Sequence, residues 1–152
     1  LLVDKSGRIY GSALIGQNFT DSSYFVGRPS ATAERPYNAA ASGGSNLGPT
    51  NRVLLTGIEE RIGFLDEHGI KGPYPSDLVT ASASGLDPHI SLDAALIQVP
   101  AVAKARNMSE ADLRTIVLSH KEQVCLPFCR EYVNVLLLNQ DLDARSKEGE
   151  HG

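Results

Sequence analysis

The stretch that decides the fold class lies near the C-terminus and reads Tyr132-Val-Asn-Val-Leu-Leu-Leu138. Val133, Val135 and Leu137 alternate along it, which is the two-residue period of a strand. The positions between them are also partly apolar, and a strand with apolar residues on both faces is typical of the centre of a sheet. We therefore predict a last, central strand over 132–138, followed from Asp141 by a charged tail that frays.

Two further strands are predicted at the other end of the chain, at Leu1–Val3 and Ile9–Ile15. The intervening Asp4-Lys-Ser-Gly7 is rich in turn-forming residues, and its glycine is free to adopt a positive φ. We expect an N-terminal hairpin that joins the C-terminal strand in one small sheet.

An amphipathic helix is predicted between Asn51, or the preceding threonine, as its cap and Gly69 as its stop. Its apolar residues recur at helical spacing and fall on one side: Leu54, Ile58, Ile62 and Leu65. This helix supplies one face that must be buried against the rest of the fold.

Shorter helices follow, and each has a local signal. Ser91 caps a helix that Pro100 ends or kinks, and the proline can itself start a new turn over 101–106. Ser109 caps another helix, which runs to about Lys121.

Taken together, these elements predict an α+β fold in which three to four short helices accompany the small sheet. Leu78–Ala81 adds a short strand or an extended link. The 152 residues suit one domain, 1–152, without an internal repeat.

Composition excludes several classes of partner. The chain carries 14 basic and 18 acidic residues of interspersed sign, for a net charge of -4. Nucleic acid needs a basic stripe to neutralise phosphates, and an anionic membrane surface needs a polybasic segment; neither is visible. The longest apolar run, Val135–Leu138, is far shorter than the ~20 residues of a spanning helix.

Both cysteines lie in Cys125-Leu-Pro-Phe-Cys129. They are either two small buried apolar side chains or a local disulfide, since the proline could turn the chain and bring the sulfurs together. Zinc would need further Cys or His at ligand spacing, and none lies nearby, so we predict no metal site.

Residues 17–51 show neither helical nor strand periodicity, and we expect their aromatic side chains and backbone hydrogen bonds to hold them. Within them, Ser42–Asn46 could cradle an anion through successive N–H groups, but this segment lacks the lysine of a P-loop. The alternative is a tight turn. Arg28 stands beside a proline and could bind a carboxylate or phosphate, or pair with a local acid such as Asp21.

A second polar segment, Thr80–His89, contains hydroxyl groups, a carboxylate and an imidazole. A serine hydrolase built from Ser84 and His89 is an alternative, but clustering in sequence does not bring catalytic partners together in space, and Gly-x-Ser-x-Gly is absent. A structured turn is favoured, and no residue is assigned a catalytic role. The candidates for binding a nucleotide or partner are Gln17, Asn18, Phe19, Arg28, Ser42, Gly43, Gly44, Ser45, Asn46, Ser82, Ser84, Gly85, Asp87 and His89.

Long motifs in these segments resemble the KdpC family, the C subunits of potassium-pumping Kdp P-type ATPases. Gly11-Ser-Ala-Leu-Ile-Gly-Gln-Asn-Phe19 is similar to the family's opening motif. Further matches follow in the family's order at 25–30, 41–49, 78–91 and 98–100. The sequence departs from the family pattern at Cys125–Cys129 and just after it, where a lead rich in Gly and Pro is usual.

The resemblance implies an accessory, non-catalytic subunit of a high-affinity, ATP-driven potassium importer. Family members carry one N-terminal membrane helix followed by a soluble domain, and the resemblance implies that this chain is that domain with its anchor removed. The implied location is the cell (inner) membrane, single-pass, with the soluble domain on the extracytoplasmic side. The implied partners are the ATP-hydrolysing and channel-like subunits.

Two roles follow from the resemblance. One is to raise the ATP affinity of the ATP-hydrolysing subunit as a "catalytic chaperone", and the other is to act near the extracytoplasmic potassium entrance. No cofactor is expected to bind tightly, and ATP is expected only through the complex. The alternative is a direct nucleotide-binding module in which Gln17, Ser42–Asn46 and Arg28 make the contacts.

Overall fold

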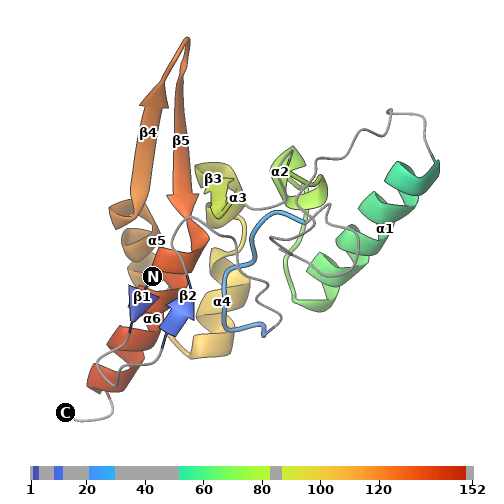
Figure 1. Ribbon diagram of the computed structural model, residues 1–152. Helices are drawn as coiled ribbons and strands as arrows, with labels where there is room; N and C mark the ends of the chain where they lie inside the picture. The colour runs from blue at the N-terminus through green and yellow to red at the C-terminus, as the bar shows by residue number, and fades with distance from the viewer. Residues whose placement is uncertain (1, 4–8, 12–20, 30–51, 83–86, 150–152) are drawn as a thin grey trace.

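The computed structural model describes residues 2–3, 9–11, 21–29, 52–82 and 87–149 (Figure 1). Helices and a small antiparallel sheet alternate along the chain, which confirms the predicted α+β class. In chain order the elements are β1 (Leu2–Val3), β2 (Ile9–Gly11), α1 (Arg52–Glu67), α2 (Ser76–Val79), β3 (His89–Ser91), α3 (Leu92–Leu96), α4 (Val99–Arg106), α5 (Glu110–Ser119), β4 (Lys121–Cys125), β5 (Cys129–Asn134) and α6 (Val135–Gly149).

The main sheet has the order β3-β5-β4, with both pairs antiparallel. β5 is therefore central, as the sequence predicted. The predicted N-terminal hairpin is present, because β1 pairs antiparallel with β2. The expectation that this hairpin shares a sheet with the C-terminal strand is wrong, since β1 and β2 form a separate two-stranded sheet.

The predicted strand over 132–138 is only half correct. β5 ends at Asn134, whose Oδ1 accepts a hydrogen bond from the Leu137 N–H at 3.1 Å. This is an N-cap, and it starts α6 at Val135. The fraying tail predicted from Asp141 is also wrong, because α6 continues to Gly149 and buries Leu142 in the core.

Two other elements differ from prediction. β3 and β4 were not predicted as strands, because β3 has only three residues and all five residues of β4 are exposed, so neither carries a buried alternating pattern. Leu78–Ala81 was predicted as a strand or extended link. Its first two residues instead close α2, and the backbone becomes extended only at Thr80.

Three local signals act in the remaining helices as predicted, whereas the predicted cap at Asn51 or Thr50 lies outside the described residues. α1 stops before Gly69, whose φ of 78° is the left-handed conformation that glycine adopts without strain. Ser91 Oγ caps α3 by accepting from the Ala94 N–H at 3.1 Å, and Ser109 Oγ caps α5 by accepting from the Asp112 N–H at 3.3 Å.

One hydrophobic core joins these elements. The irregular segment 21–29 lies beside α4 (Figure 1). Phe25 and Val26 of this segment are buried in the core. The largest buried side chains of this core come from the 21–29 segment, α1, α2, β3, α5 and α6: Phe25, Leu65, Leu78, Ile90, Leu113, Leu138 and Leu142. The expectation that aromatic side chains hold this region is confirmed for residues 21–29.

Cys125 and Cys129 form a disulfide across the turn between β4 and β5. Of the two alternatives for the cysteines, the local disulfide is therefore confirmed. The buried reading is wrong, because both residues are exposed on a hairpin that projects from the body (Figure 1). Within the described ranges, no helix combines the length and the apolar character that a membrane span requires.

Candidate functional site

A pocket of about 470 Å³ opens where α2, the start of α3, β3 and β5 meet. Arg28 reaches it from the 21–29 segment, so four separate stretches of sequence build it. The side chains that line it are mostly charged or hydroxyl-bearing: Arg28, Ser76, Asp77, Asp87, His89, Ser91, Leu92, Asp93, Arg130, Glu131 and Tyr132.

Asp77 fixes one wall of the pocket. Its Oδ2 accepts a hydrogen bond from the Ser91 N–H at 2.6 Å, and its Oδ1 accepts one from the Ser91 hydroxyl at 3.0 Å. The Ser91 oxygen in turn caps α3. One carboxylate therefore connects α2 to the junction of β3 and α3, and its charge is used to position backbone.

His89 lies between two carboxylates. Its Nδ1 is 3.1 Å from Asp87 Oδ1, and its Nε2 is 3.2 Å from Glu122 Oε2 on β4. Asp87 Oδ1 also accepts from the His89 backbone N–H at 2.9 Å. The hydrogen bond to Asp87 raises the pKa of His89, burial opposes it, and the charge of Glu122 adds to it. The same hydrogen bond lowers the pKa of Asp87.

Arg28 and Ser82, two of the predicted binding residues, have different environments: Arg28 lines the pocket and Ser82 does not. Arg28 Nη2 donates to the Ala81 carbonyl at 3.2 Å. Ser82 is 3% exposed, and its hydroxyl has no hydrogen-bond partner among the described residues. Ser82 therefore belongs to the interior and does not line the pocket.

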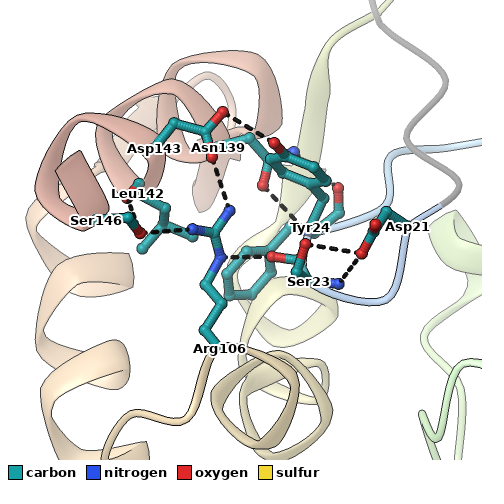
Figure 2. A network of polar contacts seen from close by, with 9 residues as sticks. Asp21, Ser23, Tyr24, Arg106, Asn139, Leu142, Asp143 and Ser146 are labelled. Atoms are coloured by element: carbon teal, nitrogen blue, oxygen red, sulfur yellow. Dashed lines mark hydrogen bonds and ion pairs between the residues drawn. The ribbon is translucent and has the colours of Figure 1, made fainter. Parts of the chain in front are cut away.

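A second polar cluster holds the 21–29 segment in place (Figure 2). Arg106 on α4 donates from Nε to the Ser23 carbonyl, from Nη2 to Asp143 at 3.1 Å and from Nη1 to Ser146 at 3.2 Å. The Tyr24 hydroxyl donates to the other oxygen of Asp143 at 3.0 Å. The network joins the segment to α4 and α6.

Two fully buried amides complete this attachment. Gln98 accepts from the Val26 N–H at 2.8 Å and donates to the Val26 carbonyl at 3.1 Å. Asn139 does the same for Phe25 at 2.9 Å in both directions. The two amides thus satisfy backbone groups that a neighbouring strand would otherwise bind.

The structure brings together some of the residues that the sequence suggested for binding a nucleotide or partner. Arg28, Asp87 and His89 meet at the pocket, whereas Ser82 is buried away from it. The remaining candidates lie outside the described residues and stay predictions: Gln17, Asn18, Phe19, Ser42, Gly43, Gly44, Ser45, Asn46, Ser84 and Gly85.

Sequence reasoning missed Asp77, Asp93, Arg130 and Glu131, which line the pocket from other elements. It also missed the buried amides, although Gln98 between two apolar residues was a usable signal, because a polar side chain within an apolar run must find a partner.

The pocket carries more negative than positive charge. Four carboxylates (Asp77, Asp87, Asp93 and Glu131) line it, against the two guanidinium groups of Arg28 and Arg130. No group of three metal-ligating side chains converges in the part of the chain that the structure describes. The arrangement suits recognition of a group that presents hydrogen-bond donors or positive charge.

Comparison with known proteins gives a consistent result. Residues 1–144 match the family model described as KdpC: K+-transporting ATPase, c chain. A protein of Methanosphaerula palustris named potassium-transporting ATPase KdpC subunit is 52% identical over 145 residues, covering 95% of this chain and 76% of the relative. A protein of the same name from Geobacter sulfurreducens is 54% identical over 144 residues, covering 94% and 76%. Another, from Geotalea uraniireducens, is 53% identical over 147 residues, covering 96% and 78%.

Proposed function

The chain belongs to the KdpC family of potassium-transporting ATPase subunits, and from this we propose that it is an accessory, non-catalytic subunit of an ATP-driven potassium-import complex. Its work is to bind companion subunits, namely the ATP-hydrolysing and channel-like subunits. The chemistry of ATP hydrolysis and ion passage belongs to those companions.

One observation carries the non-catalytic part of this proposal. The polar groups around the pocket are bound to one another: Asp77 to Ser91, and His89 to both Asp87 and Glu122. A general base needs a ring nitrogen directed at the proton it removes, and both nitrogens of His89 face carboxylates. These groups position loops and strands, which supports a recognition surface.

The charge of the pocket supports a protein partner over a nucleotide. A triphosphate would face four carboxylates and two guanidinium groups, and the excess negative charge of this lining would repel it. Lysine or arginine side chains of a companion subunit fit this balance. Any rise in ATP affinity is therefore proposed to act through the ATP-hydrolysing subunit, with no nucleotide bound at this pocket.

The disulfide supports the proposed side of the membrane. Disulfides persist in oxidising compartments, and Cys125–Cys129 is a disulfide on an exposed hairpin. We place the domain on the extracytoplasmic side of the cell membrane. Labelling of Lys147, an exposed residue, by a membrane-impermeant amine reagent in intact spheroplasts tests this placement; protection until lysis would reverse it.

The accessory role is tested by a matched pair of charge reversals in the assembled complex. Asp93 and Asp112 are both exposed acids in the first turn of a helix, but only Asp93 lines the pocket. Asp93→Lys is expected to reduce co-purification of the companion subunits about tenfold, and Asp112→Lys to leave it unchanged. The proposal fails if deleting the whole subunit leaves assembly and potassium affinity at their normal values.

The direct nucleotide-binding alternative has its own test. Titration calorimetry of the full-length subunit with ATP is expected to give no binding heat at millimolar nucleotide. Heat that disappears on Gln17→Ala would instead favour a site among residues outside the described ranges.

A further inference from the structure

The hairpin of β4 and β5 ends in an apolar tip made of Val124, Leu126 and Phe128. These residues are 52%, 87% and 76% exposed, and Leu126 and Phe128 are the most exposed large hydrophobic residues in the described part of the chain. No charged residue lies between Gln123 and Cys129. Large apolar side chains gathered at one projecting point are typical of an interaction site.

The tip is held rigidly. The Cys125–Cys129 disulfide closes the turn, and β4 pairs with β5 along its whole length. At the base, Lys121 Nζ is 2.8 Å from Glu131 Oε1 across the two strands. A rigid element loses little conformational entropy on binding, so the hairpin suits insertion into a preformed site.

Two further contacts attach the base of the hairpin to the body. Glu122 binds His89 on β3 at 3.2 Å, and His120, directly before β4, binds Asp141 on α6 at 2.9 Å. The hairpin therefore has a fixed direction relative to the pocket face, and it projects from the same sheet that lines the pocket (Figure 1).

Charge argues against a lipid surface as the partner. The tip is neutral, and the flanking residues of the hairpin, Lys121, Glu122, Arg130 and Glu131, carry two positive and two negative charges. The whole chain carries -4. Binding to an anionic bilayer requires basic residues around the apolar anchor, and they are missing here.

Area argues against a second copy of this chain. The three side chains expose an apolar surface on the order of 400 Å². A stable interface needs about 800 Å² from each partner, so two tips in contact would bury too little. The tip is of the right size for an anchor within a larger contact, where an aromatic residue fills a pocket on the partner.

We propose that the β4–β5 hairpin docks Leu126 and Phe128 into an apolar pocket on a companion subunit of the potassium-transporting ATPase complex. This inference rests on the proposed accessory role, and it names the residues that anchor the chain to its companion subunit. The pocket face beside the hairpin then meets polar groups of the same companion, because both surfaces belong to one sheet.

The test uses the full-length subunit co-expressed with its companion subunits. Leu126→Ser with Phe128→Ser is expected to lower co-purification of the companions at least tenfold. The matched control, Leu55→Ser with Leu118→Ser, changes two other exposed leucines, which are 47% and 44% exposed, and is expected to stay within twofold. Equal recovery with both double variants would overturn the inference.

A second measurement keeps the inference testable if the tip variant folds poorly. A photo-crosslinking phenylalanine analogue at position 128 is expected to crosslink to a companion subunit in the assembled complex. A crosslink to lipid, or to a second copy of this chain, overturns it. If the tip variants assemble normally while deletion of the subunit blocks assembly, the hairpin inference fails and the accessory role stands.

Discussion

Phe25 and Asn139 exchange two hydrogen bonds although they lie 114 positions apart in the sequence. The Phe25 N–H donates to Asn139 Oδ1 and Asn139 Nδ2 donates to the Phe25 carbonyl, each at 2.9 Å. Phe25 is completely buried and Asn139 is 1% exposed. A single amide on α6 thus fixes the backbone of an irregular segment in the core, as a paired strand would.

Replacing this amide is expected to be costly. Asn139→Leu leaves one buried N–H and one buried carbonyl without partners, and each such group costs about 1–3 kcal/mol. We expect a loss of about 2–5 kcal/mol in the free energy of unfolding, measured by urea denaturation. Lys147→Leu, at an exposed position of the same helix, is the control and is expected to change it by less than about 0.5 kcal/mol. A loss below 1 kcal/mol for Asn139→Leu would contradict the assignment.

Arg106 is expected to be irreplaceable by lysine. Its guanidinium contacts Ser23, Asp143 and Ser146 at once and lies 5.0 Å from the Tyr24 ring centre. An ammonium group cannot reach these acceptors together, so Arg106→Lys should lower the free energy of unfolding by about 1–3 kcal/mol.

Arg145→Lys is the matched control for Arg106. Arg145 binds Asp141 one turn away and its side chain is 55% exposed, against 9% for Arg106. The control is expected to cost less than about 0.5 kcal/mol. If both substitutions lowered the free energy of unfolding equally, the burial of Arg106 and its three contacts would contribute nothing to stability.

The Asp87–His89–Glu122 cluster predicts a pH dependence of stability. The pKa of His89 is raised, so its contribution is complete below the unfolded value of about 6.5 and is lost as pH rises through the higher folded value. The pKa of Asp87 is lowered, so its contribution is present above about 3.9 and is lost as pH falls through the lower folded value. The cluster therefore stabilises the folded chain most between about pH 3.9 and pH 6.5, where both contributions are present.

The measurement compares the parent chain with His89→Gln by urea unfolding across this range. Glutamine keeps a hydrogen-bonding group but cannot gain a proton, so the stability difference should be largest near pH 5–6 and shrink at higher pH. Asp87→Asn should remove much of the same dependence, because Asp87 makes the largest contribution to the His89 shift. A difference that does not vary with pH would rule out the ionised cluster.

Replacing Ser82 by alanine is expected to affect stability differently from replacing a serine that caps a helix. Its hydroxyl is buried without a partner in the described structure, so Ser82→Ala removes an unsatisfied group and should leave stability unchanged or raise it by up to about 1 kcal/mol. Ser109→Ala removes the N-cap of α5 and should lower the free energy of unfolding by about 1 kcal/mol. Urea denaturation measures both variants. A loss with Ser82→Ala would indicate a hydrogen bond to residues outside the described ranges.

The sequence predicted the helices well where their signals are local. Ser91 and Ser109 cap the helices that follow them, and Gly69 ends α1, because each signal acts on backbone groups within a few residues. The same local reasoning failed at Val135, because apolar residues spaced for a strand also fit the first turn of a helix. There the Asn134 cap decided between the two.

The candidate site was predictable only in part. Arg28, Asp87 and His89 were singled out from the sequence, and they do meet at the pocket. Asp77 and Glu131 were not, because nothing near them in the sequence indicates a shared site. They reach the pocket only through α2 and the central strand β5.

The sequence by itself determined the class of the fold, the family, the end of α1 and the starts of α3 and α5, because periodicity, motif order and capping are properties of neighbouring residues. Tertiary structure alone decided which residues form the pocket, how the 21–29 segment is held and where the apolar hairpin points. Those features depend on contacts between residues far apart in the chain, such as Phe25 with Asn139 and His89 with Glu122. Such contacts leave no local pattern, since each partner meets the other only after the intervening chain has folded.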